Sequence, residues 1–584
     1  MCGIAGFNFK LSDKEKEFVF NKLNHRGPDE KGLYEDKISL FHTRLSIQDL
    51  KNSHQPFFYN DYVIVFNGEI YNHLDLRIKL SDFNFKTKGD TETLLYYFLK
   101  YGADGLNEID GMWSFCIYDK KANKLYLSRD RAGKKPLFYY KKNKKFGFSS
   151  ELNVFKFLDL SLDEKEIKLY LHSGFLESPY YEIKEINPGS LVEVNLENLE
   201  MKEFKYFDIY EVYKEEKIKD EKEAIFLIDK ALNKSVKNRI ISTDVGFGAF
   251  LSGGIDSGLV VAKASEFQKI NTYTVKFEDS FDESSLAKLV SQKYNTNHTE
   301  IEINTKNLKD EIVDIILGYG KPFFDSSAIP SFYVSREARK YEKVVLNGDG
   351  ADELFGGYRR YVPLRYSLIS FAKLLPSFKA NKRSLKMFLY RLKRASKYNG
   401  FKRYNVMLND LFIDEFEFRE YDEFINSLDL DEFDKMLYLD FIWNLRYGLL
   451  MKMDIATMRN SLEARSPFLS KYFLEIAPRI DKSLKVKKFN TKYILRELAK
   501  KYLPDELITA PKRGFEIPLI KWVNEDLNEV IMDYLRYGFY KNFIDSKLVD
   551  KIINRKIEIP EERRAKIIYL LFVLEVWAYE NCFS

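Results

Sequence analysis

The chain has 584 residues and a mass of 69.1 kDa, and chains of this length usually contain more than one hydrophobic core. Hydrophobic residues make up 45% and charged residues 31%, which excludes a mostly disordered chain, and a net charge of +5 does not by itself indicate a nucleic-acid or membrane partner. The longest uninterrupted apolar run, residues 567–574, is much shorter than the about 20 residues of a membrane-spanning helix.

The cysteine content and the first residues bear on the cellular compartment. Three cysteines are too few for a disulfide framework, so a reducing compartment is expected. The start MCGIAGFNFKLSDKEKE has neither the basic beginning nor the long apolar core of a secretory signal peptide. We therefore expect a cytoplasmic protein.

Residues 1–150 are expected to form antiparallel sheets with helices packed outside them. Short segments rich in β-branched and aromatic residues lie between Gly, Asn and Asp breaks, which is typical of strands. The strands predicted in this way are 38–47, 61–70, 114–119 and 124–130. Residues 91–102 form the clearest helical pattern of this region.

A different pattern begins near residue 220, after a Lys- and Glu-rich stretch at 195–222 that we interpret as a connection. Strands now alternate with helices, which favours a parallel, doubly wound sheet. The predicted strands are 245–252, 272–277, 298–303 and 343–347, and the predicted helices are 285–294 and 328–342. Since ligands of such sheets bind at the carboxyl ends of strands, the loops after residues 251, 277 and 347 are candidate site loops.

Two neighbouring stretches of the last third carry opposite charge. Residues 359–403 contain fourteen Lys or Arg and no Asp or Glu, whereas residues 404–440 contain twelve Asp or Glu and two Lys or Arg. A basic patch could bind RNA or a phosphate-rich ligand. Because opposite neighbours partly cancel, we favour helices that pair electrostatically and expect no nucleic-acid partner.

Cys2 is a candidate nucleophile. Removal of Met1, which the small Cys2 side chain permits, would leave residue 2 with both a thiol and a free α-amine. Such an amine has a pKa of about 7.7–8.0, so part of it is neutral at pH 7 and can accept the thiol proton. Nucleophile and general base would then belong to one residue.

Six motifs occur in order around this cysteine. They are MCGIAGF (1–7), HRGPDE (25–30), RLSIQ (44–48), NGEIYNH (67–73), GDTET (89–93) and SRDRAGKKPLFY (128–139). Together they closely resemble the glutaminase domain of class II glutamine amidotransferases, the amino-terminal-nucleophile type with a four-layered αββα fold. The resemblance implies that Cys2 attacks the amide of glutamine and releases ammonia.

The same resemblance implies roles for the groups that bind the substrate. Asn67 and the Gly68 N–H would form the oxyanion hole, a kind of group whose loss typically costs about 3–4 kcal/mol of barrier. Arg44, a planar two-pronged donor, would bind the substrate carboxylate, and Asp90 with Glu69 would bind its ammonium.

The segment FLSGGIDSG (250–258) follows a predicted strand and opens a helix. Its small residues let several backbone N–H groups approach an anion, and the helix N-terminus adds favourable partial charge. The pattern is neither GxxxxGK[ST] nor GxGxxG. SGGxDS resembles the PP-loop of ATP pyrophosphatases, which cleave ATP between the α and β phosphates and leave AMP on a carboxylate.

Further segments extend this likeness over the second half of the chain. They are TYTVKFEDSFDE (272–283), KPFFDSSAIPSFYVS (321–335), LNGDGADELFGGY (346–358), LLMKMDIATMRNSLEARSPFL (449–469) and APKRGF (510–515). They resemble the carboxy-terminal domain of glutamine-hydrolysing asparagine synthetases. The combined resemblance implies an α/β chain with an αββα glutaminase domain at 2–205, then a doubly wound parallel PP-loop domain with a helical C-terminal part at 222–584.

The resemblance also implies the nucleotide-site residues. Those expected around ATP are Leu251, Ser252, Gly253, Gly254, Asp256, Ser257, Val275, Asn347 and Gly348. Asp256 and Asp352 would hold Mg²⁺, which prefers oxygen ligands shared with phosphates. Asp349 would lie near the acyl-adenylate, and Lys512 would neutralise phosphate charge. For Lys452, Asp454 and Arg465, ligand contact and an ion-pair network that supports helices are equally open.

Two such sites in one chain imply glutamine-dependent asparagine synthesis. ATP, L-aspartate, L-glutamine and water would give L-asparagine, L-glutamate, AMP and pyrophosphate. Two departures concern the acceptor: Asp349 stands where asparagine synthetases usually have Glu, and Lys321 stands where many relatives have Glu. The alternative is therefore the same amidotransfer onto another carboxylate, such as a surface-polysaccharide sugar acid or a peptide side chain.

Two readings of other classes are disfavoured. The intact PP-loop argues against a stand-alone amino-terminal-nucleophile hydrolase, and the intact glutaminase motifs argue against an RNA-modifying PP-loop enzyme. The expected partners are thus small-molecule substrates, without a membrane partner. The sequence leaves a homodimer open.

Overall fold

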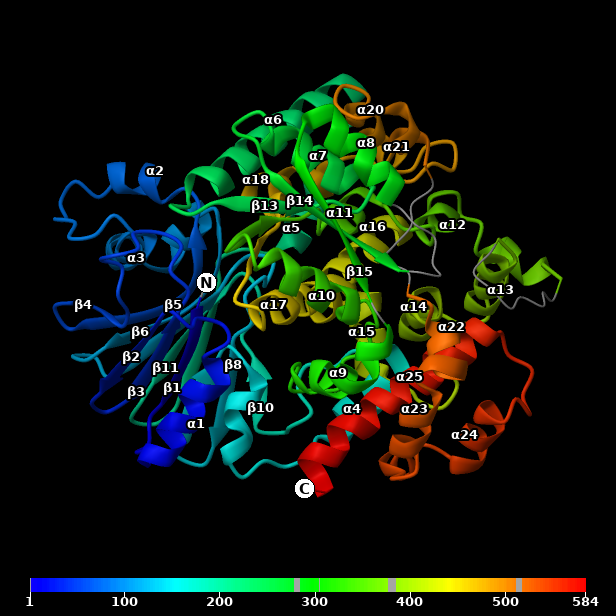
Figure 1. Cartoon of the computed structure of the whole chain (residues 1–584), viewed down its shortest axis with the longest axis horizontal. Helices are drawn as coiled ribbons and strands as arrows, with labels where there is room; N and C mark the ends of the chain where they lie inside the picture. The colour runs from blue at the N-terminus through cyan, green and yellow to red at the C-terminus, as the bar shows by residue number, and fades with distance from the viewer. Residues whose placement is uncertain (1, 278–283, 304, 377–384, 511–516, 584) are drawn as a thin grey trace.

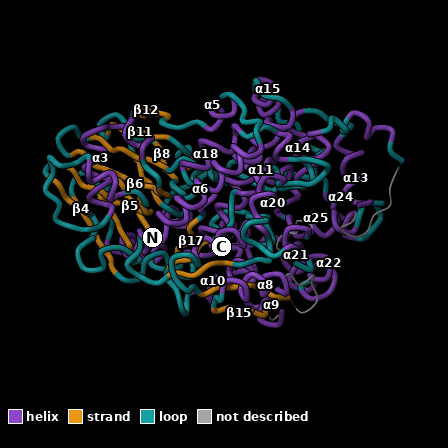
Figure 2. The backbone as a smooth tube through the Cα atoms, turned by 90° about the horizontal axis from the view of Figure 1, so that it is seen from above, coloured by secondary structure: helices purple, strands orange, loops and turns teal. Residues whose placement is uncertain are grey.

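The computed structural model describes residues 2–277, 284–303, 305–376, 385–510 and 517–583. Strands gather in the first third of the chain and helices in the remainder, so that one end of the molecule is strand-rich and the other helix-rich (Figures 1 and 2). None of the described helices is long and apolar enough to cross a membrane.

Two six-stranded antiparallel sheets form the N-terminal region. In spatial order the first consists of β10 (Ile183–Glu185), β8 (Phe138–Lys142), β9 (Lys145–Ser149), β1 (Cys2–Phe7), β3 (Ser39–Arg44) and β2 (Glu30–Glu35). The second consists of β12 (Met201–Lys205), β11 (Ser190–Asn195), β7 (Lys124–Arg129), β6 (Gly111–Asp119), β5 (Tyr62–Ile70) and β4 (Phe57–Tyr59). Their facing sides share one apolar core, which includes Ile4, Leu40, Val65 and Cys116.

Helices cover the outer faces of this pair of sheets. They are α1 (Asp13–Leu23), α2 (His73–Ile78), α3 (Asp90–Gly105) and α4 (Glu164–Ser173). Helix α1 begins at a capping box, in which Ser12 accepts from the Glu15 N–H and the Glu15 carboxylate accepts from the Ser12 N–H. The four layers confirm the αββα fold, and each strand and helix predicted between residues 38 and 130 is present with ends shifted by at most a few residues.

A five-stranded parallel sheet forms the second region, which confirms the doubly wound prediction. Its order is β15 (Asn297–Ile303), β14 (Asn271–Phe277), β13 (Phe247–Phe250), β16 (Val344–Leu346) and β17 (Glu463–Arg465). Strands β14 and β15 follow β13 on one side of the sheet, whereas β16 and β17 are added on the other side. Such sheets bind ligands at this switch point between β13 and β16. The edge strand β17 was not predicted, since three residues without alternation carry no strand pattern.

Helices surround this sheet and form the helical C-terminal part. Those next to the sheet are α5 (Ile209–Lys214), α6 (Glu221–Ile241), α7 (Ile255–Ala264), α8 (Ser284–Tyr294), α9 (Thr305–Leu317) and α10 (Ala328–Ala338). The main later ones are α11 (Ala351–Phe355), α12 (Tyr361–Arg365), α13 (Leu385–Ala395), α14 (Gly400–Leu408), α15 (Arg419–Ser427), α16 (Glu432–Leu439), α17 (Met451–Met458), α18 (Lys471–Ile476), α20 (Tyr493–Ala499), α21 (Asp505–Thr509), α23 (Asn528–Leu535), α24 (Ser546–Ile553) and α25 (Glu561–Ala578). A π-helical segment, η4 (Asp440–Leu450), joins α16 to α17.

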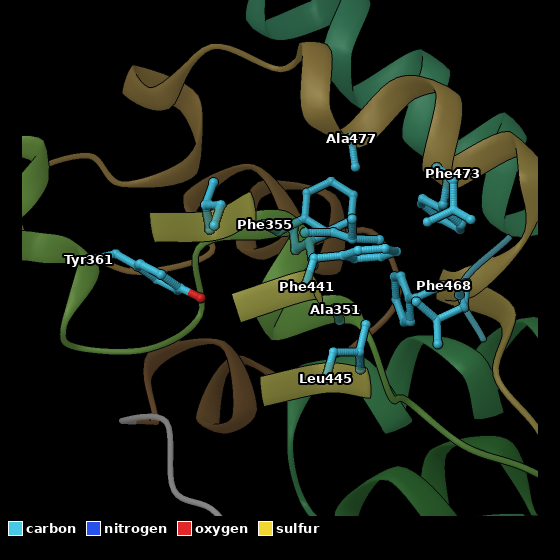
Figure 3. Close-up of a cluster of buried hydrophobic side chains, with 14 of the residues drawn as sticks. Ala351, Phe355, Tyr361, Phe441, Leu445, Phe468, Phe473 and Ala477 are labelled. Atoms are coloured by element: carbon cyan, nitrogen blue, oxygen red, sulfur yellow. The ribbon is translucent and has the colours of Figure 1, made fainter. Parts of the chain in front are cut away.

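An aromatic cluster anchors α11, the short helix after β16. Phe355 packs edge-to-face on Phe468 and Phe473, with ring centroids 6.3 and 5.9 Å apart. Figure 3 shows these rings together with Phe441 and Leu445 of η4. Because the cluster is buried, the position of α11 behind the sheet edge is fixed by packing.

The opposite charges of 359–403 and 404–440 pair within the described residues. Arg394 contacts Asp410 at 2.6 Å, and Lys402 lies 3.7 Å from Glu417. Arg360 also reaches the buried Asp440 at 2.9 Å. The prediction of electrostatic pairing is confirmed for these residues.

Candidate active sites

Cys2 begins strand β1 and lies between the two sheets of the N-terminal region. Its backbone N–H donates to Asn67 Oδ1 on β5 at 3.1 Å, and Arg44 of β3 is its partner in the strand register. Burial raises the pKa of the thiol, although nearby Arg44 and the Leu45 N–H favour the thiolate. The thiol therefore needs an adjacent base to become a nucleophile.

Asn67 is oriented by partners on both sides of its amide. While Oδ1 accepts from Cys2, Nδ2 lies 3.3 Å from Ser114 Oγ on β6, which leaves one amide hydrogen for a further acceptor. Gly68 follows on β5, and a Cβ there would lie 2.2 Å from the Met112 carbonyl. Only glycine fits this approach of the two strands.

The predicted ammonium-binding carboxylates lie together and are buried. Asp90, at the start of α3, accepts from the Ile70 N–H at 2.8 Å, and burial raises its pKa to about 6. Burial and the charge of Asp90 also raise the pKa of Glu69, whose Oε1 has no hydrogen-bond partner among the described residues. Arg44 contacts Glu30 at 3.2 Å and the Asp49 carbonyl at 2.9 Å.

The PP-loop connects β13 to α7 at the switch point of the parallel sheet. Ser257 Oγ accepts from the Ser252 N–H at 3.1 Å and donates to the Gly254 carbonyl, which closes the turn. Gly253 has φ +64°, a conformation that side chains disfavour. Leu251 precedes this turn, and its N–H donates to the Tyr273 carbonyl on β14, two residues before Val275.

The loop after β16 packs directly on the PP-loop. A Cβ on Gly348 would lie 2.9 Å from the Ser257 nitrogen and from the Asp256 Cβ, so glycine is required at this approach. Asn347 donates through Nδ2 to the Asp349 carboxylate at 2.7 Å. The structure thus brings the predicted residues of both loops together at one sheet edge.

Lys492 completes this site and was not predicted from the sequence. It is 1% exposed, and its Nζ lies 2.5 Å from Asp256 Oδ2 and 2.7 Å from Asp352 Oδ1. One lysine in NTKYIL carries no sequence signal that separates it from surface lysines. Predicted Lys512 lies outside the described residues.

Asp256 and Asp352 are the two carboxylates expected to hold a cation. No group of three or more His, Cys, Asp or Glu suited to a metal occurs among the described residues. Asp256 Oδ1 is nevertheless buried without a hydrogen-bond partner in that part of the chain, and its other oxygen shares a lysine with Asp352. Two carboxylates fit Mg²⁺, which takes its other oxygens from phosphates and water.

Comparison with known families covers nearly the whole chain. The family described as Asparagine synthase matches residues 227–579, and the Glutamine amidotransferase domain matches residues 1–206. The chain belongs to the glutamine-hydrolysing asparagine synthetase family. It is 30% identical to asparagine synthetase [glutamine-hydrolyzing] 1 of Bacillus subtilis over 99% of this chain and 96% of that protein.

Two further relatives of the family show similar likeness. A putative asparagine synthetase 2 of Methanocaldococcus jannaschii is 36% identical over 65% of this chain and 79% of its own length. A putative asparagine synthetase of Mycobacterium bovis is 30% identical over 86% of this chain and 83% of its own length.

The amidotransferase and synthase domains of this family member meet in a buried ion-pair network. Asp454 of α17 binds Arg26 through two hydrogen bonds of 2.8 and 3.2 Å and Lys135 at 2.9 Å. Arg26 also donates to Glu151 and to the Cys2 carbonyl. Asp454 and Arg465 thus both form buried ion pairs, Arg465 with Glu463 and Glu69, and the Asp454 network reaches the nucleophile strand.

Two other residues from the sequence analysis also serve contacts at or near this interface. Lys321 is buried, and its Nζ donates to the carbonyls of Leu176 and Glu177 at 2.8 and 3.0 Å. His25 is held by Glu151 at 2.8 Å. Lys321, which stands where many relatives have Glu, thus forms a contact between the two domains.

A small cavity lies between the domains, on the side of Asn347. Its volume is about 20 Å³, which is room for one water-sized molecule. Lys134 and Lys135 line it from the amidotransferase domain, and Asn347 and Ser466 from the synthase domain. Lys134 Nζ is buried without a hydrogen-bond partner in the described residues, and burial lowers its pKa to about 7.

Proposed function

We propose that this protein makes L-asparagine from L-aspartate, ATP and L-glutamine. The observation that carries the proposal is the joint presence, in one chain, of the residues predicted around Cys2 and of those predicted at the PP-loop, with Asp454 of the synthase domain bound to Arg26, which donates to the Cys2 carbonyl. Full-length likeness to a glutamine-hydrolysing asparagine synthetase supports aspartate as the acceptor.

The first half of the reaction releases ammonia at Cys2. With Met1 removed, the α-amine, which Asn67 Oδ1 holds, accepts the thiol proton, and the thiolate sulfur adds to the amide carbon of glutamine. The free Asn67 Nδ2 hydrogen and the Gly68 N–H stabilise the oxyanion. The C–N bond then breaks with proton return to nitrogen, ammonia leaves, and water hydrolyses the thioester to glutamate.

Substrate orientation at this site rests on charge. Glu69 and Asp90 bind the α-ammonium of glutamine, and Arg44 turns from Glu30 to the α-carboxylate. A bidentate guanidinium–carboxylate pair provides that geometry. The cavity lined by Lys134 and Asn347 admits a molecule the size of ammonia.

The second half activates aspartate at the PP-loop. The carboxylate of aspartate attacks the α-phosphate of ATP, the bond to the β-phosphate breaks, and pyrophosphate leaves toward the loop Ser252–Ser257 and Lys492. Ammonia then attacks the acyl carbon, AMP departs with the bonding electron pair, and asparagine forms. Asp349, which accepts from Asn347 in the loop after β16, would lie near this acyl group.

Several parts of this assignment are inferred from chemistry and family membership. Asp256 and Asp352 would hold Mg²⁺, which supplies charge neutralisation for the leaving pyrophosphate. Lys512 would add a second positive charge there, and Leu251 with Val275 would flank adenine. We assign glutamine hydrolysis to residues 2–205 and synthesis to 222–584, and place the enzyme in the cytoplasm.

The decisive experiment measures pyrophosphate and products together. Purified full-length protein receives glutamine, ATP and Mg²⁺ with aspartate, glutamate or a hexuronic acid, and products are identified by mass. Of the three acids, we expect only aspartate to give a product, with pyrophosphate, AMP and asparagine formed in equal amounts. Pyrophosphate release with another acid but not with aspartate would overturn the proposed acceptor.

A variant separates the two sites. Cys2→Ala should abolish glutamine-dependent synthesis and leave ammonia-dependent synthesis within about twofold, because ammonium chloride replaces the first site. Loss of both activities in a folded variant would contradict separate sites.

Asp256→Ala should have the opposite effect, with pyrophosphate release lost and glutamine hydrolysis retained.

A further inference from the structure

Arg465 occupies the centre of the buried interface between the two domains. It ends strand β17 of the synthase domain and is fully buried. Its Nε contacts Glu463 at 2.5 Å, and Nη1 donates to the Arg239 carbonyl and, at 2.8 Å, to Ser242 Oγ. The guanidinium thus binds the carboxyl end of α6, where unpaired carbonyls favour a cation.

The second terminal nitrogen of the same guanidinium reaches into the amidotransferase domain. Arg465 Nη2 lies 3.3 Å from Glu69 Oε2, across 396 residues of sequence between the two. Glu69 is 3% exposed, and its other oxygen has no hydrogen-bond partner among the described residues. One oxygen is therefore held by the synthase domain, and the other is left for a substrate ammonium.

The backbone of Arg465, rather than its side chain, is hydrogen-bonded to the nucleotide loop. In the β16–β17 register Arg465 pairs with Leu346, and the Asn347 N–H donates to the Arg465 carbonyl at 2.9 Å. Asn347 in turn holds Asp349 and lies in the loop packed on the PP-loop. A shift of that loop therefore moves the residue that orients Glu69.

We propose that Arg465 is a positioning residue that couples the nucleotide loop to the glutamine subsite by orienting Glu69. The proposal rests on the proposed function and deepens it, since it makes glutamine binding depend on a side chain of the other domain. Burial next to Asp90 disfavours a charged Glu69, and the cation of Arg465 opposes that penalty. The glutamine subsite is incomplete without β17.

Arginine is required for this arrangement. Its planar fork contacts two carboxylates and three helix-end acceptors at once, whereas the single ammonium of lysine cannot span them. A lysine would keep the charge and lose the orientation of Glu69. Arg465→Lys therefore tests position, and Arg465→Gln tests charge and position together.

The test compares these variants with Arg239→Lys in the full-length enzyme. Arg239 is equally buried beside Arg465, and its side chain contacts Ser235 and Asp110 but not Glu69. We expect both Arg465 variants to raise KM for glutamine about tenfold or more, within the range of known site couplings, with kcat of hydrolysis little changed. Ammonia-dependent synthesis should stay within about twofold, and Arg239→Lys should leave KM for glutamine unchanged.

A second measurement addresses coupling. ATP with aspartate should change KM for glutamine in the native enzyme and in Arg239→Lys, and should have no effect on it in Arg465→Lys. In the double variant Arg465→Gln with Glu69→Gln, the effects on KM should be less than additive. Thermal unfolding of each variant identifies a merely misfolded protein.

Two outcomes overturn the proposal. One is an unchanged KM for glutamine in folded Arg465→Gln, and the other is nucleotide-dependent glutamine binding that persists in Arg465→Lys. Failure of the proposed function is distinct, because it would appear as a native enzyme that forms no asparagine from ammonia, aspartate and ATP. Glutamine hydrolysis would still report on Arg465 in that case.

Discussion

Lys492 shows how single residues hold the buried carboxylates of the nucleotide site. Its ammonium lies between Asp256 and Asp352, each within 2.7 Å, and only 1% of the residue is exposed. Burial of such charges is costly unless each has a partner, so the lysine compensates both carboxylates before any phosphate binds.

Lys492→Met should therefore damage stability and synthesis together. We expect a loss of about 3–5 kcal/mol in the free energy of unfolding, because two buried carboxylates lose their partner. Pyrophosphate release should fall at least about a hundredfold, the scale on which lost electrostatic stabilisation acts. Urea unfolding and a pyrophosphate assay measure these effects. Lys500→Met, which removes an exposed pair with Glu497, is the control and should change neither by much.

Asp90 should make glutamine binding depend on pH. Burial raises its pKa to about 6, so the carboxylate that faces the substrate ammonium is largely lost as the pH falls from 7 to 5. KM for glutamine should rise about tenfold over that range. Asp90→Asn should show a high KM and a weaker dependence on pH, which Glu69 with its raised pKa would still contribute. A native profile that is no steeper than that of Asp90→Asn would contradict the assignment.

The same raised pKa has a defined sign for stability. The folded state of Asp90 binds its proton more tightly than the unfolded chain does. Its contribution to stability is therefore fully present below the unfolded pKa of about 3.9 and is lost as the pH rises through about 6. At neutral pH the ionised Asp90 therefore lowers the free energy of unfolding.

Much of the site at this scale could be predicted from the sequence, because each motif is short and local. Asn67 and Gly68 are adjacent in one motif, and Asp256 and Ser257 in another, so the residue pattern implied their proximity. Lys492 could not be found in this way, since its partners lie 140 and 236 residues away and the lysine itself follows no motif. Such a pair becomes visible only in the folded chain.

At the scale of elements, the α11 cluster determines where Asp352 stands. Phe355 ends this five-residue helix and packs on Phe468 and Phe473, while Phe441 comes from η4. So short a helix has little stability of its own and depends on packing. The apolar cluster thus positions a carboxylate of the nucleotide site.

Phe355→Ala should destabilise the protein by about 3–5 kcal/mol, because the phenyl group is fully buried and leaves a cavity. Phe355→Leu retains most of the volume and should cost less than half as much. Denaturant unfolding measures both. Pyrophosphate release should fall more than glutamine hydrolysis does, since α11 belongs to the synthase domain alone. Equal losses in the two activities would mean that the cluster supports both sites.

Strand β17 could not be predicted from the sequence. The longer strands β5 and β14 were both predicted, since β5 begins with an apolar run over residues 62–66 and β14 alternates over residues 272–277. By contrast, β17 has only Glu463, Ala464 and Arg465, two of them charged, and exists because it pairs with β16. Its tertiary partners override a local pattern that is not strand-like.

At the scale of the whole molecule, Asp454 ties the two domains together. It is the shared partner of Arg26 and Lys135, both buried in the amidotransferase domain. The charge of Arg26 and then of Lys135 holds the pKa of this carboxyl below its usual range, although burial acts in the opposite direction. Removal of this carboxylate takes the ion-pair partner from buried Lys135 and leaves buried Arg26 with Glu151 alone.

Asp454→Ala should therefore cost about 3–5 kcal/mol of stability. Because Arg26 donates to the Cys2 carbonyl, glutamine-dependent synthesis should fall more than ammonia-dependent synthesis. Calorimetry and the two synthesis assays give these values. The exposed pair Asp314–Arg459 supplies the control, since Asp314→Ala should change stability by about 1 kcal/mol or less.

Helix α25 also links distant parts of the chain. The Leu570 carbonyl accepts from Tyr170 of α4 at 3.1 Å, and its apolar residues join a core that includes Phe7 and Leu171. The ribosome adds this helix only after it has synthesised the residues that precede Glu561. The amidotransferase layers therefore complete their packing only after α25 has been made. A chain that ended before this helix would lack the apolar contacts that cover Phe7 and Leu171.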